Sequence, residues 1–411
     1  MSLEDWAFSS NASWCERGLE RTEKVISGSQ SPRTVVDGRE VLLAGSSDYL
    51  GLGTNRALAN AAHEATLRAG VGSGGSRLTT GTSDYHVALE RDVAGFVGAP
   101  AALVFGSGYH ANMGVIPALA AAARDCGERL SIFSDADNHA SIIDGIRLAK
   151  SRYQGVRSSV YPHLDVKTLE DQLAADASER RLIVSDGVFS MTGELANLHA
   201  LQELARDYTA WLMIDDAHGI GTLGRNGRGV CEHFDLPLPD IYIGTTSKAL
   251  GVAGAFVSGS EPLIELCRQR CRSYVFSTSM PPSQAAAISA ALALVPSRVQ
   301  RLAHVVHNLR QRLRANGWKV VDSPAPIIVL PVGAEAVAME CAAQAAERGV
   351  IVSPIRYPSV PLGQALLRLT AHADYSEDDI ALIVDALGSP SLAMGSGEGN
   401  PPGTERGHDE S

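Results

Sequence analysis

Short apolar runs alternate with amphipathic stretches through the middle of the chain. Between two of the runs, residues 197–208 place Leu198, Leu201 and Leu204 on one face of a helix. Strand and helix in alternation predict an α/β fold, in which a mainly parallel sheet has helices on both faces. We expect its strands at 101–105, 130–135, 158–162, 181–186, 211–216 and 241–247.

The pattern changes after about residue 290. Apolar spacing there predicts helices at 300–315, 335–347 and 377–387, and strands at 327–332, 349–355 and 366–371. These elements would form a smaller α+β domain. The final stretch is rich in Gly, Pro, Ser and charge, so it has too little apolar surface to order itself. We therefore predict four parts: an N-terminal segment (1–50), a large domain (51–288), a small C-terminal domain (289–390) and a disordered tail (391–411).

Composition excludes several classes of protein. The 411 residues are 45% hydrophobic and 20% charged, as in ordinary soluble enzymes, and the net charge of −11 argues against a nucleic-acid binder. The six cysteines are scattered without metal-ligand spacing. The N-terminus lacks the pattern of a signal peptide, and no apolar run approaches the roughly 20 residues of a membrane span. We expect a cytoplasmic protein that binds no metal and no membrane.

A single lysine follows one predicted strand in "GTTSKALG", 244–251. Most lysines are solvated, but the apolar run before Lys248 and the glycines around it favour a buried position. Burial lowers the pKa of an amine and makes it a nucleophile, so Lys248 is a candidate Schiff-base lysine. Thr245, three residues earlier, could add a hydroxyl to a phosphate site.

A glycine turn follows the predicted strand 101–105 in "FGSGYHAN", 105–112. If a helix begins there, the backbone N–H groups near Gly108 and Tyr109 would form an anion cup. A plain turn between strand and helix would have the same glycines.

Two further motifs carry acid and imidazole groups past strand ends. In "DDAH", 215–218, Asp215 could hold a protonated ring nitrogen while His218 reaches a neighbouring ring oxygen. A metal site is the alternative, although no second group of metal ligands is adjacent in the sequence. His139 follows strand 130–135 and could stack on a flat ligand, or it could be a structural histidine. Together with the lysine and the anion cup, these groups describe a site for pyridoxal 5′-phosphate (PLP).

Many motifs of the chain resemble those of the α-oxoamine synthases and occur in the same order between about residues 35 and 388. They are "SSDYLGL" 46–52, "GVGSGGSRLTTGT" 70–82, "NHASIIDG" 138–145, "DGVFSMTGELANL" 186–198, "DDAHGIGTLGRNGRG" 215–229, "GTTSKALG" 244–251, "FSTSMPP" 276–282 and "YPSVPLGQALLRLTA" 357–371. These synthases are fold-type I PLP enzymes that condense an amino acid with an acyl-CoA.

The resemblance implies a role for each matching residue. Lys248 would hold the cofactor and later act as the base at the amino acid's Cα, Asp215 would hold the pyridine nitrogen, and His218 would hold the phenolic oxygen. The remaining roles are stacking on the ring (His139), contact beside it (Ser190), phosphate binding (Thr245, Gly108, Tyr109) and binding of the amino-acid carboxylate (Arg368), for which the planar guanidinium is suited. The family also implies a homodimer in which the segments near Ser76 and Thr278 reach the neighbour's cofactor.

Departures from the family pattern bear on the substrate. Ser47 stands at a substrate-contacting position where the family usually has asparagine, and His163-Leu164-Asp165 stands where it has "HND". Ser76 stands where the 5-aminolevulinate synthases of this family typically have threonine, and the smaller side chain leaves room for a methyl group. The resemblance therefore implies alanine and a pimeloyl thioester, delivered by CoA or by a carrier protein, as substrates, with an α-amino ketone, CoA and CO2 as products.

Other assignments stay open at this point. Glycine with succinyl-CoA, glycine with acetyl-CoA, and a natural-product enzyme with another acyl group are the alternatives within the family. An inactive cofactor-binding subunit is an alternative outside catalysis, but such a protein would have no need of Lys248.

Overall fold

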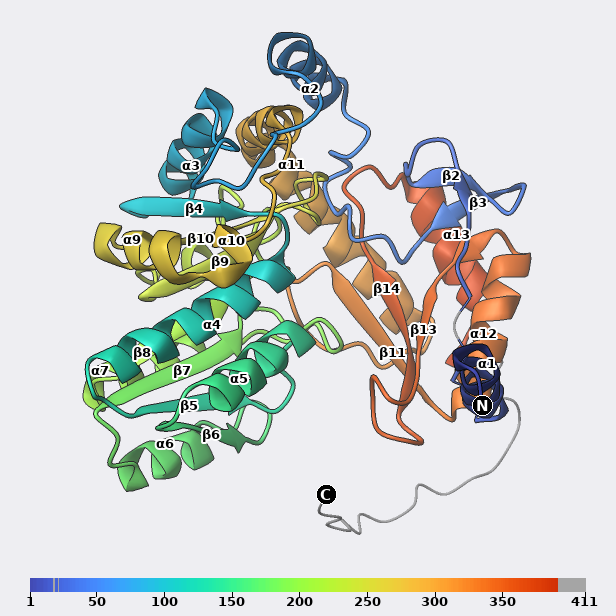
Figure 1. Cartoon of the computed structure of the whole chain (residues 1–411). Coiled ribbons are helices and arrows are strands. Elements are labelled where there is room, and N and C mark those ends of the chain that lie inside the picture. The colour runs from blue at the N-terminus through green and yellow to red at the C-terminus, as the bar shows by residue number, and fades with distance from the viewer. Residues whose placement is uncertain (18, 21, 391–411) are drawn as a thin grey trace.

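The computed structural model describes residues 1–17, 19–20 and 22–390, so the predicted tail at 391–411 lies outside the described residues. A seven-stranded sheet forms the centre of the larger part of the molecule (Figure 1). β10 is antiparallel to both of its neighbours, and the other six strands all run in the same direction. In spatial order the strands are β4 (Ala101–Phe105), β10 (Ala255–Gly259), β9 (Ile241–Thr245), β8 (Trp211–Asp215), β7 (Arg180–Asp186), β5 (Leu130–Asp135) and β6 (Val156–Tyr161). The predicted α/β class with a mainly parallel sheet is confirmed.

Helices cover both faces of this sheet, as the nearly continuous burial of its strands requires. Successive residues of β7 show the division, because Leu182 and Val184 belong to one hydrophobic core and Ile183 to the other. The first core includes α4 (Gly108–Asp125), α5 (Ala140–Arg152), α9 (Glu261–Arg270) and α10 (Arg272–Val275). The second includes α3 (Asp84–Val97), α6 (Val166–Ala175), α7 (Leu198–Asp207), α8 (Val230–His233) and α11 (Pro282–Ala315).

The smaller part contains two small sheets. One has the order β11-β14-β13, and the other joins three N-terminal strands to β12 through a parallel pairing with β3. The strands are β11 (Ile327–Gly333), β13 (Ser353–Ile355), β14 (Ala365–Thr370), β1 (Ile26–Ser27), β2 (Arg33–Val36), β3 (Arg39–Leu43) and β12 (Val350–Ile351). The helices here are α12 (Glu335–Glu347) and α13 (Glu377–Leu387), which have the predicted bounds.

Helix α11 connects the two parts (Figure 1). It begins 18 residues before the predicted helix at 300–315, so the predicted domain boundary at 288/289 falls inside one continuous helix. Pro281 and Pro282 start it, as prolines favour the first helical positions. α2 (Arg56–Ala69) packs along α11, whereas α1 (Leu3–Glu16) buries none of its side chains.

The segment after β3 is hydrogen-bonded to β14 and to the residues that follow it. The Thr370 N–H donates to Ala44 O (2.8 Å) and the Ala373 N–H to Tyr49 O (2.7 Å). The Thr370 hydroxyl donates to Ser46 O (2.7 Å). The N-terminal segment therefore lies beside Arg368 of β14, at the edge of the larger part.

Candidate active site

Carboxyl ends of parallel strands meet in one cavity of about 200 Å³. Asp215 and Thr245 are the last residues of β8 and β9, and His139 is the N-cap of α5 after β5. This is where α/β sheets bind ligands. The cavity is lined by eight residues that the sequence singled out, namely Gly108, Tyr109, His139, Ser190, Asp215, His218, Thr245 and Lys248.

Lys248 lies three residues beyond the end of β9, and its Nζ lies 2.8 Å from His218 Nε2. Burial lowers the pKa of Lys248 to about 8, although the carboxylates of Asp215 and Asp186 act in the opposite direction. A measurable fraction of the amine is therefore neutral near neutral pH, which is the form that attacks a carbonyl carbon.

Asp215 is buried and held by two donors. The Asn112 Nδ2 donates to its Oδ2 (2.7 Å), and the Ala217 N–H donates to its Oδ1 (3.1 Å). Asn112 also donates to Ser141 Oγ (2.8 Å), which lies 2.7 Å from His139 Nδ1. This chain of polar groups fixes the orientation of both Asp215 and His139.

His218 is buried between two partners, Tyr49 on its Nδ1 (2.7 Å) and Lys248 on its Nε2. Burial and the positive charge of Lys248 hold the pKa of His218 well below its usual value, so the imidazole is neutral. Asp215 is therefore bound to Asn112 and Ala217, whereas His218 is bound to Tyr49 and Lys248. Among the described residues, no group of three or more His, Cys, Asp or Glu could hold a metal ion.

The residues predicted to bind phosphate lie together where α4 begins. The Thr245 side chain lies beside Gly108, and its hydroxyl is 2.7 Å from the Ser247 hydroxyl. In the first helical turn, the His110 N–H donates to the Ser107 hydroxyl (3.2 Å). The earlier N–H groups, of Gly108 and Tyr109, have no acceptor within the helix and are available to an anion.

Asp186 is a site carboxylate that the sequence reasoning missed. It ends β7, is buried, and accepts a hydrogen bond from the His139 N–H (3.0 Å). Burial and the neighbouring Asp215 raise its pKa well above the usual value. Its position at the end of an apolar run, like that of Asp215, was the available signal. The sequence around Tyr49 and Asn112 contains no comparable signal for their contacts in the site.

Arg368 and Ser47 belong to the smaller part of the molecule and are not among the residues that line the cavity. Arg368 is mostly buried on β14, and its Nε donates to Ser190 O (2.7 Å), which ties the two parts together. Ser47 lies two residues before Tyr49, in the segment that is hydrogen-bonded to β14.

The structure does not bring Ser76 and Thr278 into this cavity. They pair with each other in an isolated antiparallel bridge, and Thr278 is exposed. The expectation that they reach a neighbouring subunit stays a prediction.

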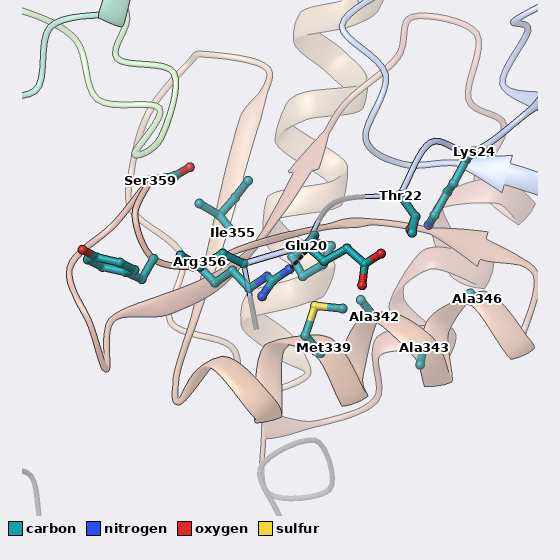
Figure 2. A pocket seen from close by; sticks show the side chains of 13 residues that line it. Glu20, Thr22, Lys24, Met339, Ala342, Ala343, Ala346, Ile355, Arg356 and Ser359 are labelled. Atoms are coloured by element: carbon teal, nitrogen blue, oxygen red, sulfur yellow. Dashed lines mark hydrogen bonds between the residues drawn. The ribbon is translucent and has the colours of Figure 1, made fainter. Parts of the chain in front are cut away.

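A larger cavity of about 510 Å³ lies elsewhere, between the N-terminal segment and the smaller part (Figure 2). Met339, Ala342 and Ala346 of α12 form one wall, and Glu20 and Arg356 lie opposite. None of the residues predicted from the sequence lines it. No helix in the described residues is long and apolar enough to cross a membrane.

Comparison with known proteins gives a consistent result. The family model "Aminotransferase class I and II" matches residues 39–387. The chain is 44% identical to the 8-amino-7-oxononanoate synthase of Methylococcus capsulatus, over 90% of this chain and 94% of that protein. It is 43% identical to the biotin biosynthesis bifunctional protein BioWF of Corynebacterium kroppenstedtii, over 94% of this chain but only 58% of that protein.

A solved structure extends the likeness to a bound cofactor. A lysine-to-alanine variant of serine palmitoyltransferase from S. paucimobilis, with a bound PLP–myriocin aldimine, superposes with a TM-score of 0.86. It is 28% identical, and the match covers 95% of this chain and 98% of that chain.

Proposed function

This chain belongs to the aminotransferase class I and II family, and we propose that it condenses an amino acid with an acyl thioester, releasing CoA or a carrier thiol and CO2. The observation that carries the proposal is the cavity itself. A partly neutral lysine, a buried aspartate, a neutral histidine and a phosphate cup surround one small space at the ends of parallel strands.

The residues of this cavity fit PLP. Gly108, Tyr109 and Thr245 would hold the phosphate, and Asp215, fixed by Asn112, would hold the pyridine nitrogen in its protonated form. His218 would donate to the phenolic oxygen, and His139 and Ser190 would lie against the ring. When bound, the cofactor supplies an electrophilic carbon for Lys248 and an electron sink for the substrate.

The chain's own groups then move the protons and orient the substrate. Arg368 binds the amino-acid carboxylate through its planar guanidinium. Lys248, once released from the cofactor, takes the proton from the amino acid's Cα, for which a base with a pKa of about 8 is suited. The new carbon–carbon bond forms at Cα, the thiol leaves, and the original carboxylate departs as CO2. Lys248 then returns a proton to Cα.

For substrates, we propose alanine and a pimeloyl thioester, the pair used by an 8-amino-7-oxononanoate synthase. Support comes from relatives of that name that match nearly the whole chain, and from Ser76, which leaves space for a methyl group. An extra methyl group in a pocket changes specificity by roughly 10–200-fold. We further propose a cytoplasmic homodimer, with Ser76 and Thr278 placed at the partner's cofactor.

The alternative is a sister condensation with another amino acid. Its support is the structural likeness to serine palmitoyltransferase and Ser47, which is smaller than the asparagine it replaces. Glycine with succinyl-CoA would indicate a 5-aminolevulinate synthase, and glycine with acetyl-CoA a 2-amino-3-ketobutyrate CoA ligase.

A matrix of substrates tests this function. We would measure kcat/KM for alanine, glycine and serine against pimeloyl-, succinyl-, acetyl- and palmitoyl-CoA, and identify the amino ketone by mass. Alanine with pimeloyl-CoA should give the highest value. A higher value for any other pair would assign the chain to that sister activity. If turnover occurs only when an acyl carrier protein delivers the acyl group, the proposed reaction stands and the acyl donor is the carrier protein instead of CoA.

A further inference from the structure

Tyr49 joins two groups of site residues that come from different parts of the chain. Its ring is fully buried, and its hydroxyl lies 2.7 Å from His218 Nδ1. On the other side of the imidazole, His218 Nε2 lies 2.8 Å from Lys248 Nζ. Three side chains thus form a continuous line from the N-terminal segment to the reactive amine.

The surroundings of the phenol set the direction of these hydrogen bonds. The Arg368 guanidinium and the Ser47 hydroxyl are further polar groups that act on the phenolic oxygen. A guanidinium has donors and no acceptor, so the phenolic oxygen accepts on that side. Burial raises the pKa of Tyr49, which keeps its proton in place. That proton is then donated to His218 Nδ1.

The direction of the first bond determines the tautomer of the histidine. A neutral imidazole has one N–H and one acceptor nitrogen. With Nδ1 accepting from Tyr49, the proton of His218 is on Nε2 and points to Lys248 Nζ. An N–H donor is satisfied by the lone pair of a neutral amine, and it is repelled by an ammonium group.

The reverse direction fits this site poorly. If His218 carried its proton on Nδ1, the phenolic proton would have to turn towards Arg368, which cannot accept it, leaving Ser47 as the acceptor. His218 Nε2 would then accept a hydrogen bond and favour the protonated form of Lys248.

We propose that Tyr49 is a positioning residue that holds His218 in the Nε2–H tautomer and thereby increases the fraction of Lys248 in the neutral, hydrogen-bond-accepting form. This inference rests on the proposed function, because it assumes that Lys248 is the lysine that reacts with PLP. The same tautomer presents the Nε2–H that His218 would donate to the cofactor's phenolic oxygen.

The first test observes the tautomer directly. In the holoenzyme labelled with 15N-histidine, the His218 signals are identified by their loss in His218→Asn. A protonated Nε2 and an unprotonated Nδ1 support the proposal, whereas a protonated Nδ1 overturns it. This measurement uses the wild-type protein and does not depend on the folding of a Tyr49 variant.

The second test measures the reactivity of the amine. Full-length protein is stripped of PLP, and the rate of PLP capture is followed by absorbance over a range of pH. In Tyr49→Phe, the midpoint of this pH profile should rise by about one pH unit, so that capture at pH 7 slows by about tenfold. Tyr161→Phe is the matched control, because this buried tyrosine contacts Ser185 instead of the lysine. The midpoint of the pH profile in Tyr161→Phe should equal that of the wild type.

An unchanged midpoint in a folded Tyr49→Phe protein would overturn the proposal. In the holoenzyme, the same variant should lower kcat more than it raises KM for the amino acid, because Arg368 remains in place. A change in KM alone would assign Tyr49 to substrate binding and overturn the positioning role. Neither PLP capture nor the tautomer depends on which thioester is used, so a failed substrate assignment would leave these results unaffected.

Discussion

Lys248 is the residue that we propose reacts with the cofactor, and its surroundings explain why part of its amine is neutral. Burial lowers its pKa to about 8, while Asp215 and Asp186 limit how far the pKa falls. A lysine on the surface would be protonated at neutral pH and would react slowly. The sequence indicated this environment, because an apolar strand leads directly to the lysine.

Replacing this amine should abolish the covalent link to the cofactor. Lys248→Ala should lower kcat by about 10²–10⁴-fold or more, as expected when a proton-transfer group is lost. Borohydride should fix the cofactor to the wild-type protein and leave the variant without the added mass. Lys167→Ala, at an exposed lysine of α6, is the control. Ordinary turnover by the Lys248 variant would contradict the assignment.

His163 should make stability depend on pH. Its Nδ1 lies 2.9 Å from Asp135 Oδ1 and its Nε2 lies 3.3 Å from Glu194 Oε2, and Asp137 is also near. Burial alone would lower the pKa of His163, but these carboxylates outweigh it and raise the pKa above 6.5. The stabilisation is therefore complete below pH 6.5 and is lost as pH rises through the raised value.

Urea denaturation at a series of pH values measures this effect. The difference in unfolding free energy between wild type and His163→Gln should shrink as pH rises from 6 to 8.5. A difference that stays constant over this range would show that His163 is not charged in the folded protein.

Residue positions at the site were predictable where a strand end supplies the side chain. Asp215 and Thr245 follow apolar runs, and such runs are visible in a single sequence. Asn112 and Tyr49 were missed, because their partners Asp215 and His218 lie 103 and 169 residues away. No local pattern records contacts of that range.

At the scale of elements, the periodic helices were predicted well and the strand pairing less so. α12 and α13 have the predicted bounds, and α13 buries Ile380, Ile383 and Leu387 on one face. The first half of α11 was missed, since alanines between 285 and 291 give a weak amphipathic signal and Pro296 lies inside the helix. β10 is short and apolar, and five such residues do not reveal an antiparallel direction.

The N-terminal elements should differ sharply in how much they contribute to the stability of the fold. Removing residues 1–16 deletes α1, which buries no side chain, so the melting temperature should change by less than about 3 °C. Removing residues 1–43 also deletes β3 with its buried Val41, Leu42 and Leu43, each worth about 1.5–3 kcal/mol of burial. This longer deletion should prevent folding, as circular dichroism would show.

An equally large loss from the shorter deletion would contradict this expectation. It would show that α1 is covered in the assembled protein, and gel filtration of both truncated chains would then show whether the assembly changes.

At the scale of the whole molecule, the two parts share one site. Lys248, Asp215 and His218 belong to the larger part, whereas Arg368 and Tyr49 belong to the smaller one, and hydrogen bonds at Ser190 O and His218 Nδ1 join them. The pair of half-buried Ser76 and exposed Thr278 lies outside this arrangement. A second copy of the chain would give these two residues a function.

A mixing experiment tests whether sites are shared between copies. Thr278→Arg should disturb the partner's cofactor site, and Lys248→Ala should disable its own. After denaturation and refolding together, mixed dimers would contain one intact site, so activity should return to about a quarter of the wild-type level. Recovery of less than a few per cent would contradict a shared site.

The hydrogen bonds between residues 44–49 and the stretch from 370 to 373 also determine when the enzyme can become active during its synthesis. Ribosomes release the N-terminal part of a chain first, and contacts between distant residues form slowly. Tyr49 emerges early, but its backbone acceptor is satisfied only by the Ala373 N–H, more than 300 residues later. A nascent chain that already contains Lys248 therefore still lacks the strand that fixes Tyr49 and Arg368. With the roles proposed for Lys248 and Arg368, premature termination before β14 would leave the lysine without its substrate-binding partner, and such incomplete chains would not carry out the condensation.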